Sequence, residues 1–266
     1  MMDEQRYINW IKDKNAWISP PGCLEGIMSV PSGEDKALSV GLVMEHRFAF
    51  YFWALFASKR KSVEPKPILI SLDSHDDVGT EGEVYGLRDD LNQLNLKNRL
   101  ELGLFSWLRL RQLNDGQILP TLYLNFFSDV FILRNAKQLD NCNSNHKDRE
   151  GNPHKIRQFC EVEELLNEIP ENCPIYLDID LDFFTTIESN WGRKREEQLK
   201  SETEIRSFLS LKGQFMKPII DRLVGLTIAL EPEYCGGLFN SLRVLEILNE
   251  EFFNSTLLCF ESVWNK

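Results

Sequence analysis

The chain has 266 residues, of which 42% are hydrophobic, so it is long enough to enclose one substantial core, and we expect a single domain over residues 1–266. Its 41 acidic and 30 basic residues give a net charge of -11, which argues against nucleic acid or an anionic membrane as a partner. The N-terminus has acidic residues where a secretory signal would carry basic ones, and the longest apolar run, residues 48–57, is too short to cross a bilayer, so we expect a cytoplasmic protein.

The first part of the chain predicts little regular structure before residue 37. Residues 1–36 contain turn-forming sequences such as Pro20-Pro21-Gly22, so we expect this segment to wrap around the domain surface. The short apolar run 39–44 predicts a buried strand, and residues 46–59, which carry aromatic side chains on all sides, predict a buried helix. His46 is therefore expected at a junction between a strand and a helix.

The middle of the chain predicts two more strands. Residues 68–73 form an apolar strand candidate, followed by an acidic loop over 76–83 and by a helical region over 87–112 whose internal boundaries the pattern does not define. Residues 130–135 predict the next strand. Residues 136–155 are polar and lack apolar periodicity, so we expect a mobile surface loop there.

The remaining pattern alternates between helices and strands. Helices are predicted over residues 161–169, over 201–211 with a further helix reaching about 223, and over 238–252. Strands are predicted over 175–182 and 223–230. Such alternation is typical of an α/β protein whose parallel sheet is covered by helices on both faces.

Two predicted strands end in clustered carboxylates. The first cluster is Asp73-x-His75-x-Asp77, and the second is Asp178, Asp180 and Asp182. Alternate residues of an extended chain point to one side, so each cluster is expected to present its side chains together. A core does not tolerate clustered charge without a neutralising partner, and oxygen-rich sites with one or two imidazoles suit divalent ions such as manganese.

All of these groups fall at the carboxyl ends of predicted strands. His46 follows one such strand and Glu231 follows another, and the two carboxylate clusters end the strands in between. Ligands of open parallel sheets bind beyond the carboxyl ends of the strands. The sequence therefore predicts a metal site at this edge of the sheet.

The motifs resemble the arginase/ureohydrolase superfamily, and more closely its peptide arginase family. The resemblance covers about residues 39–250, and the stretches SLDSHDD and LDIDLDFF look like the family's two metal-binding strands. It implies an arginase-like three-layer α/β/α sandwich with a central, mostly parallel sheet of about eight strands. It also implies a hydrolase that cleaves the guanidine group of arginine residues in a peptide, giving ornithine and urea as a post-translational modification.

The resemblance further implies a binuclear centre that holds two Mn²⁺ ions. Its ligands would be His46, Asp73, His75, Asp77, Asp178 and Asp180. Asp73 and Asp178 would bridge the two ions, His46 and Asp77 would complete the shell of one ion, and His75 and Asp180 would serve the other. Asp76 and Asp182 are either further ligands or outer and solvated carboxylates, and we expect the latter.

Residues beyond the ligands would handle the substrate. The tetrahedral intermediate needs a proton delivered to the leaving amine, and we expect Asp77 to relay it. Glu231 resembles the carboxylate that clamps the guanidinium group, with Glu233 as the alternative. Gly236 and Gly237 either allow the backbone to approach the substrate closely or form a tight turn.

One departure favours a peptide substrate over free arginine. Small-molecule arginases carry a histidine after their first metal strand, whereas residues 78–114 contain none. His146 and His154, in the polar stretch 136–155, either supply that imidazole or are solvated loop histidines.

Two other functions stay open at this stage. A metal-dependent deacylase of related fold usually holds one zinc ion beside a histidine pair, and this sequence has no such pair. A non-catalytic, metal-stabilised binding protein is the other alternative. The identity of the peptide and the oligomeric state, including a homo-oligomer, are not specified by the sequence.

Overall fold

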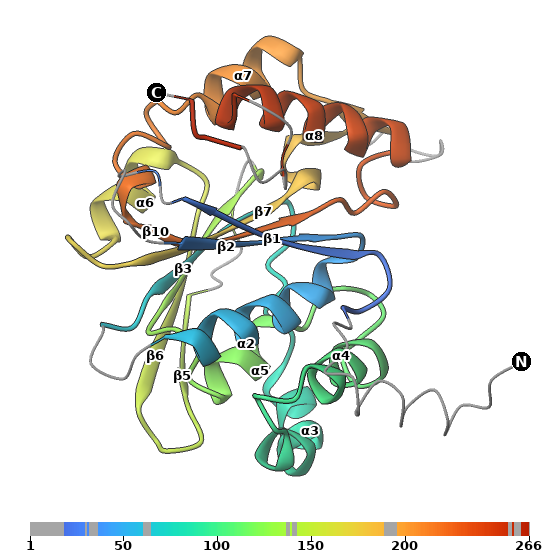
Figure 1. The fold of residues 1–266 in the computed structure, drawn as a ribbon, viewed down its shortest axis with the longest axis vertical. Helices are drawn as coiled ribbons and strands as arrows, with labels where there is room; N and C mark the ends of the chain where they lie inside the picture. Colours follow the sequence, from blue (N-terminus) through green and yellow to red (C-terminus); the bar gives the residue numbers. More distant parts are fainter. Residues whose placement is uncertain are drawn as a thin grey trace, which may run out of the picture.

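The chain folds around a mixed sheet of eight strands, seen nearly edge-on in Figure 1. The computed structural model describes residues 19–29, 31, 37–60, 65–136, 139, 143–188, 196–254, 257 and 262–265. In sheet order the strands are β1 (Cys23–Ser29), β2 (Ala37–Val43), β10 (Leu223–Ala229), β7 (Ile175–Asp180), β3 (Ile68–Asp73), β4 (Val130–Arg134), β6 (Pro153–Phe159) and β5 (Ser144–Lys147). The six inner strands are parallel, and the two edge strands, β1 and β5, run antiparallel to their neighbours.

Helices cover both faces of this sheet, which confirms the predicted α/β fold and is consistent with a three-layer sandwich (Figure 1). One face carries α2 (Ala49–Lys59), α3 (Glu81–Gln93), α4 (Arg99–Leu108) and α5 (Ile118–Tyr123). The other carries α6 (Val162–Glu168), α7 (Glu202–Leu209) and α8 (Leu238–Phe252). Short 3₁₀ turns lie at η1 (His46–Phe48), η2 (Leu181–Phe184) and η3 (Ile220–Arg222), and a small hairpin joins β8 (Thr185–Glu188) to β9 (Glu196–Leu199).

The sheet separates two apolar layers, as the alternation within single strands shows. In β7, Ile175, Leu177 and Ile179 belong to the layer that packs under α8, whereas Tyr176 belongs to the layer that contains α2. Successive side chains of a strand point to opposite faces, so both faces of β7 are buried. This explains why the central strands read as continuous apolar runs.

The buried helix α2 lies close against the sheet because two strand glycines make room for its aromatic rings. A Cβ atom on Gly41 of β2 would lie 2.4 Å from the ring of Phe52, and one on Gly225 of β10 would lie 2.7 Å from the ring of Phe56. The indole N–H of Trp53 also donates to Thr227 Oγ1 on β10 at 3.2 Å. This contact fixes the helix whose N-terminal end carries His46.

Two expectations for polar segments were wrong. Residues 23–29 form the edge strand β1, with Leu24 paired to Leu42, rather than an irregular surface wrap; residues 1–18, 30 and 32–36 lie outside the described part of the chain. Within residues 136–155, β5 and β6 form an antiparallel hairpin rather than a mobile loop. A hairpin at a sheet edge is stabilised by backbone hydrogen bonds and needs only one apolar side, so its sequence lacks a strong apolar pattern.

Several helix boundaries also differ from the prediction. The undivided region 87–112 is two helices, α3 and α4, and α3 begins inside the expected acidic loop because Thr80 and Glu83 form a capping box. The further helix expected before residue 223 is absent, because residues 211–219 form turns that lead from α7 into η3 and β10. Among the described residues, no helix is long and apolar enough to cross a membrane.

Candidate metal centre

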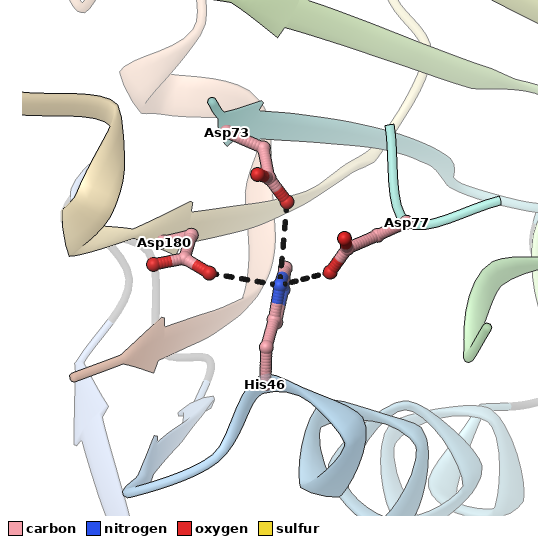
Figure 2. Close-up of side chains that lie close together, drawn as sticks. All are labelled: His46, Asp73, Asp77 and Asp180. Carbon is pink, nitrogen blue, oxygen red and sulfur yellow. Dashed lines mark ion pairs between the residues drawn. The ribbon is translucent and has the colours of Figure 1, made fainter. Parts of the chain in front are cut away.

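The predicted metal-binding side chains meet where β2, β3, β7 and β10 end. His46 begins η1 after β2, Asp73 ends β3, Asp180 ends β7 and Glu231 follows β10. Because these neighbouring strands are parallel, their carboxyl ends lie at the same edge of the sheet. Figure 2 shows His46 pointing into a ring formed by three aspartates.

The imidazole of His46 is the centre of this first group. Its Nδ1 atom lies 2.7 Å from Asp77 Oδ2, 3.1 Å from Asp180 Oδ2 and 3.3 Å from Asp73 Oδ2 (Figure 2). All four side chains are buried, and His46 Nδ1 and Asp73 Oδ2 have no hydrogen-bond partner. Three carboxylates around one ring nitrogen, with buried polar atoms unpaired, match the donor set of a divalent cation, so the residues present fit a metal ion.

Burial and mutual repulsion disfavour the ionised form of the aspartates in this cluster. Burial, together with the neighbouring Asp77 and Asp182, raises the pKa of Asp73 well above its usual value. Burial and Asp182 likewise raise the pKa of Asp180 well above its usual value. Burial disfavours the charged form of His46, but attraction by Asp178 and Asp180 outweighs it, so the pKa of His46 is raised. Each shift lowers the negative charge of the cluster, which a bound cation would do instead.

A second group shares Asp73 with the first. His75 Nδ1 lies 2.8 Å from Asp182 Oδ2 and 3.7 Å from Asp73 Oδ1. These three residues form a second set that could hold a cation. Asp73 therefore directs Oδ2 toward the His46 group, while Oδ1 faces the His75 group and accepts a hydrogen bond from the backbone N–H of His75 at 2.6 Å.

The carboxylates that β7 and the following turn contribute to the two groups are Asp180 and Asp182, rather than the expected Asp178 and Asp180. Asp178 lies in neither group; its carboxylate accepts from Ser71 Oγ at 2.8 Å and from Thr227 Oγ1, and it contacts His46 Nε2 at 2.7 Å. Ser71 and Thr227 are the residues that pair with Asp178 on the two adjacent strands. Asp178 thus lies on the far side of the His46 ring from the first group, where a carboxylate fixes the tautomer of a metal-binding histidine.

The motif Asp73-x-His75-x-Asp77 was expected to bring its side chains together because it lies on one extended strand, and this is only partly correct. β3 ends at Asp73, and the chain then turns, so that Asp77 reaches the first group with φ at 48°. His75 reaches the second group from the same turn. The convergence of the motif therefore depends on this turn rather than on a continuous strand.

Backbone strain is concentrated at the site. Of the five described non-glycine residues with positive φ, three are asparagines, which adopt this conformation readily, and the other two are Asp77 and Glu231. Glu231 has φ at 40° and accepts a hydrogen bond from the backbone N–H of His46 at 2.5 Å. Burial raises the pKa of Glu231 to about 8. Strained carboxylates of this kind are typical of functional positions.

Other residues hold the candidate ligands in place. Gln117 Nε2 donates to Asp77 Oδ2 at 2.6 Å, and the backbone N–H of Ser74 donates to Asp182 Oδ1 at 3.0 Å. Gln117 is fully buried, and nothing in its local sequence distinguishes it from an ordinary helix-start residue. Asp182 was expected to be an outer carboxylate, but it belongs to the second group. The hydroxyl residues Ser71 and Thr227, which donate to Asp178, are the sequence signal that would have favoured Asp182 over Asp178 as a ligand.

Two adjoining cavities open at the site. A cavity of about 170 Å³ is lined by His75, Asp77, Leu113, Asn114, Asp115, Asp180, Glu231 and Tyr234. A cavity of about 400 Å³ shares Asn114 and Glu231 with it and is also lined by Glu45, Arg47 and Glu233. The ring of Tyr234 packs edge-on against the imidazole of His75, with 5.1 Å between centroids. The candidate centre is therefore reached through an acidic opening.

The remaining predicted residues have other positions. Glu233 is exposed in the larger cavity, and Gly236 and Gly237 form a turn with positive φ in which the N–H of Gly237 donates to Pro232 O at 2.8 Å. His146 lies on β5 and His154 on β6, and neither lines the two cavities at the site. His154 is buried, not solvated.

No model of a known protein family matches this chain. A comparison with curated proteins also gave no match.

Proposed function

We propose that the protein is a hydrolase that uses two divalent cations, with manganese as the first choice, to cleave the guanidine group of arginine residues in a peptide. The products are ornithine and urea. One observation carries this proposal: two groups of candidate ligands share Asp73, and that residue directs one carboxylate oxygen to each group. A bridged pair of cations is the arrangement that activates water for such a displacement.

The candidate ligands suit two dications in number and charge. His46, Asp73, Asp77 and Asp180 would hold one cation, and Asp73, His75 and Asp182 would hold the other. Four aspartates carry four negative charges, which balance two dications when both imidazoles are neutral. Asp178 would orient His46 from outside.

The chain's own carboxylates would bind the substrate and move protons. When bound, the cations supply a water molecule activated for attack on the guanidinium carbon. Asp77 lies on the cavity wall, where it can take a proton from that water and pass it to the leaving amine. Glu231 lines both cavities and would bind the cationic guanidinium, with Glu233, which lines the larger cavity, as the alternative.

The cavity walls support a peptide rather than free arginine as the substrate. Among the residues that line the two cavities, Arg47 is the one Lys or Arg side chain, and it is engaged by Glu45 Oε2 at 2.6 Å and by Trp107 O at 3.4 Å. An α-carboxylate would therefore enter an acidic opening without a free basic partner. A peptide bond at that position carries no such charge.

The test is to incubate the protein, loaded with Mn²⁺, with a mixed pool of arginine-containing peptides. Conversion to ornithine would remove about 42 Da per site and release one urea, as expected for two-metal hydrolysis of the guanidine group. The variant Asp180→Asn should be inactive, while the matched control Asp129→Asn, remote from the candidate ligands, should retain activity. Absence of urea from all peptides with the metal-loaded protein would exclude the proposal.

A further inference from the structure

A second cluster of reactive side chain types lies on the edge strand β5, apart from the candidate metal centre. Ser144 and His146 are two residues apart on this strand, so their side chains point to the same side. Ser144 Oγ lies 2.7 Å from His146 Nε2, and His146 Nδ1 lies 3.3 Å from Oε1 of Glu81, the first residue of α3. A hydroxyl, an imidazole and a carboxylate are thus arranged in line.

The carboxylate sets the direction of the hydrogen bonds. An ionised Glu81 can only accept, so its contact requires a proton on Nδ1 of His146. Nε2 is then left without a proton and accepts from the Ser144 hydroxyl. Desolvation lowers the pKa of His146, and nearby His154 adds to this, while Glu81 opposes it. A lowered pKa favours the neutral form of the imidazole, which a general base needs.

A cavity adjoins this cluster and has room for an organic substrate. It has a volume of about 560 Å³ and is lined by Glu81 and His146 of the cluster, together with Gly82, Tyr85, Leu119, Leu122 and Tyr123, among others. Ser144 is not a lining residue and reaches this side of the cluster through its contact with His146. Five of its eleven lining residues are aromatic or aliphatic and suit an apolar acyl or aryl group, while Arg88, Asn145 and Lys147 add polar groups to the wall.

The start of α3 offers a donor for developing negative charge. Gly82 is the second residue of the helix, and the capping box uses the N–H groups of Thr80 and Glu83 instead. The first N–H groups of a helix have no acceptor within it and favour an anion. Gly82 also lines the cavity, and its N–H would be the donor for a carbonyl oxygen that becomes negative during acyl transfer.

We propose that Ser144 and His146 form a serine esterase site, with Glu81 as the positioning residue, that acts on carboxylic esters with apolar or aromatic groups. Ser144 Oγ forms a bond to the ester carbonyl carbon while His146 Nε2 takes the hydroxyl proton. The C–O bond to the alcohol then breaks, and His146 returns the proton to the departing oxygen. Water attacks the resulting acyl-serine in the same way, which releases the carboxylic acid and restores Ser144.

The test is labelling of the full-length protein with a fluorophosphonate probe, followed by peptide mapping. We expect the label on Ser144, its loss in Ser144→Ala, and a decrease in labelling rate of about 100-fold or more in His146→Gln, since general base catalysis contributes at least that much. Ser207→Ala, on the exposed side of α7, is the matched control and should be labelled on Ser144 at the unchanged rate.

Glu81→Gln separates a positioning role from a structural one. The capping box of α3 depends on Thr80 and Glu83, so this variant should fold normally. Because the carboxylate raises the pKa of His146, its removal should lower the pH at which labelling reaches half its maximum, and the maximum should fall. A folded protein that is not labelled at Ser144, or a Glu81→Gln variant with an unchanged pH profile, would overturn the proposal.

Discussion

Glu231 Oε1 accepts a hydrogen bond from the backbone N–H of His46 at 2.5 Å, which joins residues that are 185 positions apart in the sequence. Both residues are buried, and both follow strands that lie side by side, β2 and β10. One carboxylate oxygen of Glu231 therefore holds the histidine-bearing turn, while the other is free of this bond. In the proposed function, the same side chain would both stabilise the site and bind the guanidinium group of the substrate.

Two substitutions of Glu231 should separate these roles. Glu231→Gln keeps an oxygen that can accept from His46 but removes the negative charge, so we expect near-normal unfolding behaviour and a strong loss of turnover on arginine peptides. Glu231→Ala leaves the His46 N–H buried without a partner, which should lower the free energy of unfolding by about 1–3 kcal/mol. Urea-induced unfolding and steady-state kinetics measure the two effects.

Glu233→Gln is the matched control, because Glu233 is exposed in the same opening. Its turnover should fall much less than that of Glu231→Gln. If Glu233→Gln is the inactive variant instead, the guanidinium is bound further out than proposed.

Asp178 and Asp180 of β7, and Asp182 just after it, should respond differently to substitution by asparagine. Asp180→Asn and Asp182→Asn each remove a proposed ligand, so each should lose one bound metal equivalent. Asp178 contacts the far nitrogen of His46, so Asp178→Asn should keep both equivalents and weaken affinity by about 10–100-fold. Metal content by mass spectrometry and titration with Mn²⁺ make the comparison.

This experiment also tests the ligand assignment that the resemblance implied. If Asp178→Asn loses a metal equivalent and Asp182→Asn keeps both, the earlier assignment is correct. Circular dichroism should show that all three variants retain the fold, since otherwise lost metal reflects unfolding.

The fold was predictable because its central strands are buried on both faces. Runs such as Ile68–Asp73 and Leu223–Ala229 are mostly apolar, and a parallel sheet covered by helices buries nearly all of their side chains. The edge elements were not predictable in the same way. β1, with Leu24 and Ile27 exposed, and the polar strand β5 depend on pairing with a neighbour, which a local apolar pattern does not reveal.

The site was predictable in its location but not in its details. Carboxylates at strand ends identified the edge of the sheet and most of the converging side chains. The choice between Asp178 and Asp182 depends on cross-strand neighbours, because Ser71 and Thr227 satisfy Asp178 in the sheet. Gln117 is distant in sequence from Asp77, and only the fold brings the two together.

Removal of divalent metal should destabilise the protein. Without a cation, Asp73, Asp77 and Asp180 lie within 3.3 Å of one imidazole nitrogen and repel one another. Dialysis against a chelator should therefore lower the melting temperature, and Mn²⁺ at about 100 times its Kd should restore about 2.7 kcal/mol per site of stability. An unchanged melting temperature after complete metal removal would contradict a metal site here.

Asp148 should make the stability of the β5–β6 hairpin depend on acid pH. Desolvation opposes ionisation of this carboxylate, but hydrogen bonds from the Asn152 side chain and from the backbone N–H groups of Asn152 and Glu150 outweigh it and hold its pKa at about 2. A lowered pKa contributes stability above the unfolded value of about 3.9, and this contribution is lost as the pH falls toward 2. The free energy of unfolding should therefore decrease more steeply between pH 4 and 2 in the unmodified protein than in Asp148→Asn. Equal slopes in denaturant unfolding at these pH values would show that these hydrogen bonds contribute no net stability.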